Sequence, residues 1–336
     1  MIDSQLIEAA LAGDEGAFAK LVGPHRRPLH AHCYRMLGSL QDAEDAVQET
    51  LLRAWRKLSS FQGRSSLRTW LYTIATNACL RAIERRPSRV LPIDYGPSAD
   101  PHEPLSEPLV EAVWIEPYPE ERLGIDDDLA GPEARYEQRE SIELAFIAAL
   151  QLLPPRQRAV LILRDVLGYS GAEVAEALET TPASIYSALQ RAHATLEERG
   201  PERTQQAMLR SLGDEQLQAI VTRYAEAWAR NDVDALVGML TDTATLAMPP
   251  IPSWYRGREA IERVLREVVF IDARSWRMLP TAANGQLAVG AYELDSSGVY
   301  APHGVTVLTL EGELLSEIIH FRTPSMVERF GLPLRA

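Results

Sequence analysis

The sequence predicts a multidomain protein in which two all-α units are followed by one α+β unit. Apolar residues recur at helical spacing over residues 4–86 and again over residues 140–199. A proline-rich, acidic stretch separates these two segments, and the last third runs from helical patterns into strand-like runs. We therefore expect helical units at 1–88 and 132–200, a linker at 89–131 and the α+β unit at 201–336.

Charge is distributed unevenly along the 336 residues, whose net charge is −13. Residues 1–88 hold 12 Lys and Arg against 9 Asp and Glu, whereas residues 89–139 hold 4 against 13. Because phosphate contacts supply DNA affinity through counterion release, so acidic a chain should bind free DNA poorly on its own. The pattern favours a protein that reaches DNA as part of a larger complex.

Several classes of protein and site are disfavoured. No run of about eighteen apolar residues and no signal-peptide pattern occurs, so we expect a cytoplasmic chain with no membrane contact. Cys33 and Cys79 lie inside helical patterns and give no disulfide framework. His25, His30 and His32 crowd one segment, but their spacing does not place three ligands on one helical face. We expect no metal and no cofactor.

The most informative stretch is a pair of helices over residues 42–86. In the first, a buried stripe is predicted at Ala43, Val47, Leu51, Ala54, Trp55 and Leu58. The residues expected outside that stripe are Asp42, Glu44, Asp45, Gln48, Glu49 and Leu52. A solvent-facing leucine among carboxylates suits a surface that binds a partner.

The second helix combines an apolar side with a basic one. Its expected buried residues are Leu67, Trp70, Leu71, Ile74, Ala75, Ala78 and Ile83. Those expected to project are Arg64, Arg68, Asn77, Arg81, Arg85 and Arg86. Guanidinium groups interleaved with Phe61, Trp70 and Tyr72 are typical of a surface that follows a nucleic-acid backbone and stacks on bases.

The run DAEDAVQETLLRAW, followed by a segment from Phe61 that reads F-x-G-R-S-S-L-R-T-W-L-Y-T-I-A-T-N-A-C, resembles region 2 of bacterial extracytoplasmic-function sigma factors. The resemblance implies that the first helix docks on the clamp helices of the largest subunit of core RNA polymerase, through Asp42, Asp45, Gln48, Glu49 and Leu52. It implies that the promoter −10 element is contacted by Phe61, Arg64, Ser66, Arg68, Trp70, Asn77, Arg81 and Arg85. The loop 61–66 would hold an extruded base. Leu80 stands where many relatives carry an acidic residue, so their −10 sequence preference does not transfer.

Residues 156–199 show the spacing of a helix-turn-helix. Ser170 and Glu173 form a capping-box pattern, and Thr181 with Pro182 opens a further helix. On that last helix Ala183, Ser184, Ser187 and Arg191 are expected to face the DNA major groove. The segment LPPRQRAVLILRDVLGYSGAEVAEALETTPASIYSALQRAHATL is similar to region 4 of the same family. The resemblance implies −35 element recognition and contact with the polymerase flap.

The linker contains an aromatic segment, V-E-A-V-W-I-E-P-Y-P, over residues 110–119. A solvated tether with Trp114, Ile115, Pro117 and Tyr118 should find an apolar surface to contact. The alternative is a short packed segment with no regulatory meaning.

The C-terminal part shows helical patterns at 216–230, 233–240 and 258–268, then strand patterns at 275–282, 286–295, 301–310 and 314–322. With VTRYAEAWARNDVDALVGMLTDTATLAMPP and the closing I-H-F-R-T-P it resembles the SnoaL-like domain, a cone that encloses a pocket. Expected lining residues are Tyr224, Trp228, Trp254, Tyr255, Tyr292, His303 and His320. No nucleophile or Gly-rich loop accompanies them, so we expect no catalytic residue.

Together these patterns predict a sigma factor that binds core RNA polymerase and promoter DNA, with a C-terminal domain that modulates its activity. Such a chain is not an enzyme. Two alternatives stay open: a helix-turn-helix regulator that acts without polymerase, and a small-molecule enzyme or sensor that acts through the cone. A small-molecule ligand of the pocket is a possible further partner.

Overall fold

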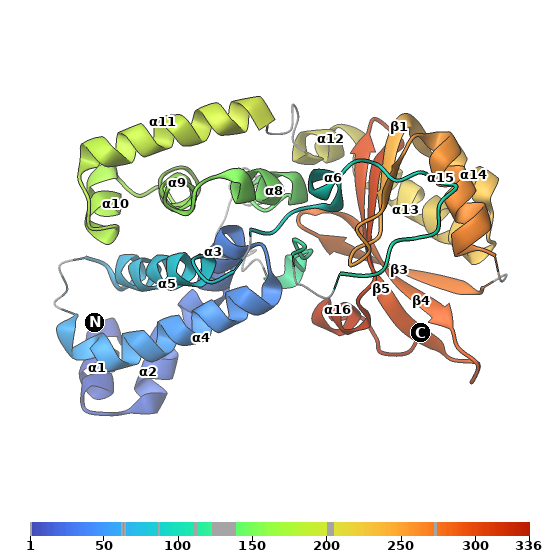
Figure 1. Ribbon diagram of the computed structural model, residues 1–336. Coiled ribbons are helices and arrows are strands. Elements are labelled where there is room, and N and C mark those ends of the chain that lie inside the picture. Colours follow the sequence, from blue (N-terminus) through green and yellow to red (C-terminus); the bar gives the residue numbers. More distant parts are fainter. Residues whose placement is uncertain are drawn as a thin grey trace. The chain divides into compact units, whose positions relative to one another are not determined.

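The computed structural model describes residues 2–61, 63, 65–86, 88–109, 113–122, 139–199, 205–271 and 274–336. The chain divides into two compact units (Figure 1). Unit 1 comprises Met1–Arg89, Arg122–Ala130 and Ala145–Gly200, and unit 2 comprises Val90–Glu121, Gly131–Leu144 and Pro201–Ala336. Unit 1 is helical and unit 2 contains the sheet, which confirms the expected fold class.

The first helical bundle of unit 1 contains helices α1 (Ile2–Leu11), α2 (Glu15–Val22), α3 (Arg26–Leu37), α4 (Leu40–Lys57) and α5 (Leu67–Ile83). Side chains in the sequence explain where these helices begin. Asp14, Ser39 and Ser66 each accept a hydrogen bond from a backbone N–H in the first turn of α2, α4 and α5. Gly38, with φ of 68°, ends α3 in the left-handed conformation that glycine adopts without strain.

The second helical bundle contains α8 (Leu144–Leu152), α9 (Pro155–Leu161), a π-helical turn at Ile162–Val166, α10 (Gly171–Ala177) and α11 (Pro182–Arg199). Ser170 and Glu173 form both hydrogen bonds of a capping box at the start of α10. The Ser184 backbone N–H donates to Thr181 Oγ1 at 3.3 Å at the start of α11. The predicted helix-turn-helix is therefore present.

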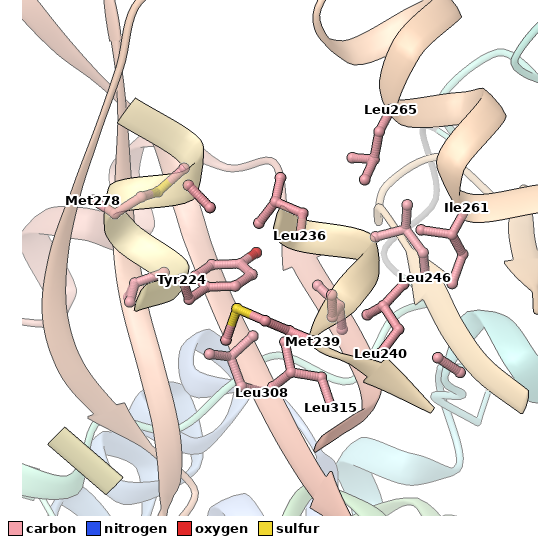
Figure 2. Close-up of a cluster of buried hydrophobic side chains, with 14 of the residues drawn as sticks. Tyr224, Leu236, Met239, Leu240, Leu246, Ile261, Leu265, Met278, Leu308 and Leu315 are labelled. Atoms are coloured by element: carbon pink, nitrogen blue, oxygen red, sulfur yellow. The ribbon is translucent and has the colours of Figure 1, made fainter. Parts of the chain in front are cut away.

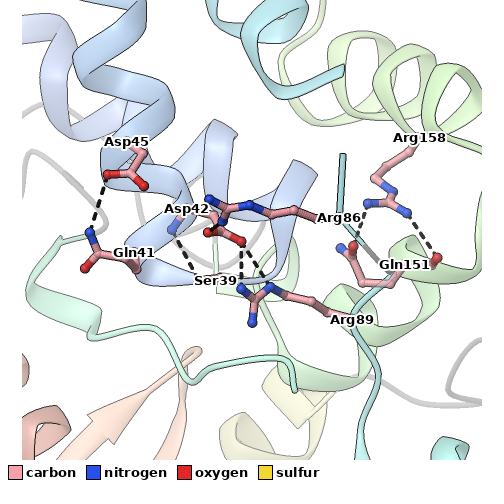
Figure 3. A network of polar contacts seen from close by, with 8 residues as sticks. All are labelled: Ser39, Gln41, Asp42, Asp45, Arg86, Arg89, Gln151 and Arg158. Atoms are coloured by element: carbon pink, nitrogen blue, oxygen red, sulfur yellow. Dashed lines mark hydrogen bonds and ion pairs between the residues drawn. The ribbon is translucent and has the colours of Figure 1, made fainter. Parts of the chain in front are cut away.

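A buried arginine joins the two bundles of unit 1. Arg158 is 2% exposed, and its guanidinium donates to the carbonyl oxygens of Met36, Gln151 and Leu153 and to Gln151 Oε1. Gln151 in turn donates to the Arg35 carbonyl oxygen at 3.3 Å. Figure 3 shows Arg158 with Gln151. The Arg35 and Met36 carbonyl groups lie in the last turn of α3, where no later N–H of the helix donates to them. The side chains of Gln151 and Arg158 supply the missing donors.

Unit 2 is built on a six-stranded sheet in the order β2-β1-β6-β5-β4-β3. Its strands are β1 (Leu240–Ala247), β2 (Trp254–Arg256), β3 (Trp276–Ala283), β4 (Gln286–Leu294), β5 (Tyr300–Glu311) and β6 (Leu314–Phe321). Strands β3 to β6 form the expected antiparallel meander. Strand β1 pairs parallel with β6 and antiparallel with β2, and neither β1 nor β2 was expected from the sequence.

The helices of unit 2 are α12 (Gln205–Leu212), α13 (Asp214–Ala229), α14 (Val233–Gly238), α15 (Arg258–Val264), which continues as a π-helical turn at Leu265–Val269, and α16 (Pro324–Arg329). Figure 2 shows part of the core, where Tyr224 and Met239 from the helical side meet Leu308 and Leu315 of the sheet. All four are at most 4% exposed. Burying an aliphatic side chain of this size contributes roughly 1.5–3 kcal/mol, so this core holds helices and sheet together.

The linker residues Val90–Glu121 belong to unit 2 and run along the cone. They include the one-turn helix α6 (Pro92–Tyr95), and the 3₁₀ turn Glu120–Arg122 begins at their end. Backbone hydrogen bonds join Ala99 N to Trp254 O at 2.8 Å and Leu109 N to Pro250 O at 3.0 Å. This part of the chain is thus a folded portion of the cone. Among the described helices, none has the length and apolar character needed to cross a membrane.

Candidate functional site

One exposed face of α4 carries Asp45, Gln48, Glu49 and Leu52, which we call the acidic face. Asp45 and Gln48 are exposed, Glu49 is partly exposed and Leu52 is 52% exposed. On the opposite side of the helix Ala43, Val47 and Ala54 are buried. A half-exposed leucine beside two carboxylates is compatible with a surface that binds a partner.

The sequence prediction for Asp42 was wrong, because its side chain is 6% exposed and faces inward. Its carboxylate forms ion pairs with Arg86 and with Arg89, the latter at 2.7 Å (Figure 3). Asp42 lies in the first turn of α4, where the helix dipole also favours a negative charge. Its role in this structure is therefore to anchor the chain that follows α5.

Two of the α5 residues expected to contact DNA face the second bundle. The Arg68 guanidinium lies 5.2 Å from the ring centre of Tyr72 and 5.5 Å from that of Tyr169. Asn77 Nδ2 donates to the Ala177 carbonyl oxygen at 3.5 Å. Tyr72 was expected to stack on bases, but it is 2% exposed and packs in the core. In this arrangement Arg68 and Asn77 are engaged within unit 1.

The loop before α5 keeps its aromatic residues together. The rings of Phe61 and Trp70 have centroids 5.1 Å apart, and both side chains are partly exposed. Ser66 Oγ accepts from the Thr69 backbone N–H at 3.0 Å, so this hydroxyl caps the helix. Arg64, another expected DNA contact, lies outside the described residues.

The remaining described basic residues expected to contact the −10 element lie beside the acidic face of α4. Arg81 and Arg85 line a groove of about 330 Å³ together with Asp45 and Glu49. Arg53 adds an ion pair to Glu49 in the same groove. The hairpin of α4 and α5 places the two sets side by side, so charge changes in one set alter the field at the other.

Helix α11 presents all four residues expected to read DNA. Ala183, Ser184, Ser187 and Arg191 are exposed. Sequence reasoning missed Tyr186, which is 56% exposed and lies against Gly171, where a Cβ atom would come 3.0 Å from the Tyr186 hydroxyl. Tyr186 lies between Ser184 and Ser187 and outside the buried positions of α11. This placement in the sequence could have predicted that its side chain is exposed.

The cone of unit 2 encloses a cavity of about 170 Å³. Four expected lining residues meet there: Tyr224, Trp228, His303 and His320. The other three were wrongly placed. The indole N–H of Trp254 donates to the Gly96 carbonyl oxygen at 2.8 Å, the Tyr292 hydroxyl donates to the Pro333 carbonyl oxygen at 2.7 Å, and Tyr255 belongs to the core. The lining residues that the sequence did not suggest include Leu105, Arg274, Trp276 and Arg322.

Two histidines stack on one wall of this cavity. Their ring centroids are 5.0 Å apart with nearly parallel planes. His303 Nδ1 lies 2.8 Å from His320 Nε2, and His320 Nδ1 lies 2.8 Å from Thr306 Oγ1. Burial, helped by the charges of Arg322 and Arg274, lowers the pKa of His303 to about 4. Burial also lowers the pKa of His320 well below its usual value, so both rings are neutral near pH 7.

His32, one of the histidines near the N-terminus, is used for packing. It is fully buried, and its Nε2 lies 2.9 Å from Thr76 Oγ1. Within the part of the chain that the structure describes, no group of three or more His, Cys, Asp or Glu side chains is arranged to hold a metal ion.

Comparison with known proteins identifies the family. Family models match residues 21–89 (Sigma-70 region 2), 143–196 (Sigma-70, region 4) and 221–318 (SnoaL-like domain). The ECF RNA polymerase sigma factor SigG of Mycobacterium tuberculosis is 43% identical over 320 residues, which is 95% of this chain and 84% of that relative. This chain belongs to the ECF RNA polymerase sigma factors.

Other members of the family match parts of this ECF sigma factor or its fold. SigM of Mycobacterium tuberculosis is 31% identical over 194 residues, covering 58% of this chain and 82% of that protein. The crystal structure of the Mycobacterium tuberculosis extracytoplasmic function sigma factor SigJ has a TM-score of 0.55 at 23% identity, covering 92% of this chain and 97% of that one. SigJ thus shares the fold of this ECF sigma factor.

Proposed function

We propose that this ECF sigma factor binds the clamp helices of core RNA polymerase through the acidic face of α4 and the polymerase flap through its second bundle. The observation that carries this proposal is Leu52, which is 52% exposed between Glu49 and Arg53. An exposed leucine gains little from burial in the free protein, whereas packing it against a partner would remove its apolar surface from water. Asp42 is left out of this surface because it is buried.

The same proposal assigns promoter DNA to α5 and α11. The partly exposed Phe61 and Trp70 would receive a base extruded from the −10 element, and Arg81 and Arg85 would contact its backbone. Unstacking a base costs a few kcal/mol, which the loop and its aromatic rings must offset. The exposed Ser184, Ser187 and Arg191 of α11 would contact the −35 element in the major groove. Arg68 and Asn77 can join only after their contacts with Tyr169 and Ala177 open.

The test is co-purification with core polymerase and run-off transcription by the Leu52→Glu variant. The variant removes an apolar side chain from the acidic face and adds a third carboxylate beside Asp45 and Glu49. Polymerase binding should weaken at least about tenfold. The unfolding midpoint should not change, because the Leu52 side chain is exposed. Glu8→Ala, an exposed change on α1, is the matched control and should bind normally. Normal polymerase binding by Leu52→Glu would contradict the assignment. Promoter binding by the chain alone, without polymerase, would favour the alternative of an independent helix-turn-helix regulator.

We further propose that the cone modulates transcription by holding the linker. Trp114, Ile115 and Tyr118 are at most 7% exposed. Trp114 Nε1 donates to the Pro250 carbonyl oxygen at 3.2 Å, and the Tyr118 backbone N–H donates to Asn284 Oδ1 at 2.7 Å. Because the segment and the cone are parts of one chain, their high effective concentration favours the bound linker. A small molecule in the cavity is a candidate regulator of this contact.

A further inference from the structure

Apolar side chains line much of the cavity in the cone, and its volume indicates what size of ligand fits. Its aliphatic and thioether lining includes Leu246, Met248, Leu265, Met278 and Ile318. At about 170 Å³ it is slightly larger than an engineered protein cavity of about 150 Å³ that binds benzene. The space therefore suits one small ring or a short aliphatic chain.

One hydrogen-bond donor of this cavity has no acceptor among the described residues. The Nε1 atom of Trp276 is buried without a hydrogen-bond partner there, and the side chain is only 5% exposed. An indole N–H can only donate, so its complement is an acceptor atom. Buried donors are almost always satisfied in folded proteins, so this orphan donor on the cavity lining favours a ligand that carries an acceptor.

Two guanidinium groups line the same cavity. Arg274 and Arg322 are both on its wall, and Arg274 forms an ion pair with Glu293 at 3.3 Å. Burial lowers the pKa of Arg322, and the neighbouring Arg274 lowers it further, because the two guanidinium groups repel each other. A carboxylate bound in the cavity would accept charge-assisted hydrogen bonds from the Arg322 guanidinium.

We propose that this cavity binds a small apolar carboxylic acid as its carboxylate. The ring or chain lies among Leu246, Met278 and Ile318, and the carboxylate accepts hydrogen bonds from the Trp276 indole and the Arg322 guanidinium. Leu105 of the linker lines the same cavity and is held there by the hydrogen bond from Ser106 N to Ser253 Oγ at 3.2 Å. The bound acid therefore contacts the linker directly. This proposal needs neither polymerase nor promoter, so it is tested independently of the sigma function.

The first experiment compares three probes of similar shape on the full-length wild-type protein: phenylacetate, phenylacetamide and 2-phenylethylamine. Calorimetric titration should show saturable binding of phenylacetate and a matching rise of the melting temperature. Phenylacetamide should bind about tenfold more weakly, because it loses the charge-assisted hydrogen bonds, and the amine should not bind. Equal affinity for the acid and the amide, or no saturable binding of phenylacetate at millimolar concentration, would overturn the proposal.

The second experiment locates the carboxylate. Arg322→Gln should lower the affinity for phenylacetate about tenfold and leave that for phenylacetamide unchanged. Trp276→Phe keeps an aromatic ring but removes the N–H, and should weaken both probes. Arg277→Gln is the matched control, because Arg277 is an exposed residue of the same strand as Trp276 and does not line the cavity. An equal loss with Arg277→Gln would also contradict the proposal. If Arg322→Gln fails to fold, the comparison of acid with amide on the wild-type protein still decides.

Discussion

Removing the buried Arg158 should weaken unit 1. Its guanidinium donates to three backbone carbonyls and to Gln151, and burial lowers its pKa to about 10, so the group is still charged near neutral pH. Arg158→Met leaves the Met36 and Leu153 carbonyls without their donor. We expect a loss of about 3 kcal/mol in the free energy of unfolding, measured by urea titration with circular dichroism. The exposed neighbour Arg156→Met should change it by less than about 0.5 kcal/mol, and equal effects would show that the buried bonds contribute nothing.

His303 makes the stability of unit 2 depend on pH. Its folded pKa of about 4 lies below the value of 6.5 for a free histidine, so the unfolded chain takes up a proton first as the pH falls. This contribution to stability is present above about pH 6.5 and is lost progressively toward about pH 4. Between about pH 7 and about pH 5 the loss should be about 2 kcal/mol.

Glu143 and Glu317 act in the opposite direction, because burial raises the pKa of each to about 7. As the pH falls through about 7, these two carboxylates take up protons in the folded protein before they do so in the unfolded chain. They therefore raise the free energy of unfolding on acidification. The measurement must therefore be a difference. Wild-type protein and His303→Asn are unfolded in urea at both pH values, and the variant should lose less stability on acidification. Identical pH dependence would show that His303 already titrates normally in the folded protein.

At the scale of single elements, helices were predictable where periodicity and caps agreed. The predicted boundaries of α10 and α11 rest on Ser170, Glu173 and Thr181, whose hydrogen bonds are local. Strand β1 was missed because L-T-D-T-A-T-L-A alternates weakly, and its pairing with β6 depends on residues some seventy positions away. The burial of Asp42 was missed for the same reason, since its partner Arg89 is 47 residues distant.

The cavity shows the same division between local and distant information. Aromatic residues marked the cone as a possible pocket, yet the sequence alone did not separate Trp228, which lines the cavity, from Trp254, which bonds the linker. Arg274 precedes β3 and Arg322 follows β6, so the two residues come to one cavity only when the sheet has formed. Charge placement inside a fold is set by strand order, which residue patterns do not specify.

The linker segment should separate from the cone when Trp114 is removed. Trp114 is 7% exposed, donates to Pro250 and packs edge-on against Tyr95 with ring centroids 5.2 Å apart. Trp114→Ala should lower the free energy of local opening of this segment by about 3 kcal/mol. The Val90 amide donates to the Val113 carbonyl oxygen and the Ile115 amide donates to the Val90 carbonyl oxygen, and hydrogen exchange at both amides should become roughly 100-fold faster. Tyr95→Ala is the control, because this ring is 51% exposed and its loss should speed exchange far less. Unchanged exchange in Trp114→Ala would mean that the backbone bonds alone hold the segment.

At the scale of the whole molecule, the chain passes between the two units more than once. It leaves unit 1 after Arg89, returns at Arg122–Ala130, enters unit 2 again at Gly131–Leu144 and rejoins unit 1 at Ala145. Under the proposed function, an event that loosens the linker from the cone gives the segment between the two bundles more conformational freedom, and so changes how the bundles are placed on a promoter.

A chain that ends at Arg199 tests this coupling. It lacks the strands and helices on which Trp114, Ile115 and Tyr118 pack, so its linker is released. We expect run-off transcription per molecule bound to polymerase to rise severalfold, because the proposed restraint is intramolecular and is lost completely. Removing the cone also exposes apolar linker residues, which invites aggregation and a spurious loss of activity. The full-length Trp114→Ala chain avoids that artefact and should shift transcription in the same direction by a smaller amount. If both chains transcribe like the wild type while binding polymerase normally, the cone does not act through the linker.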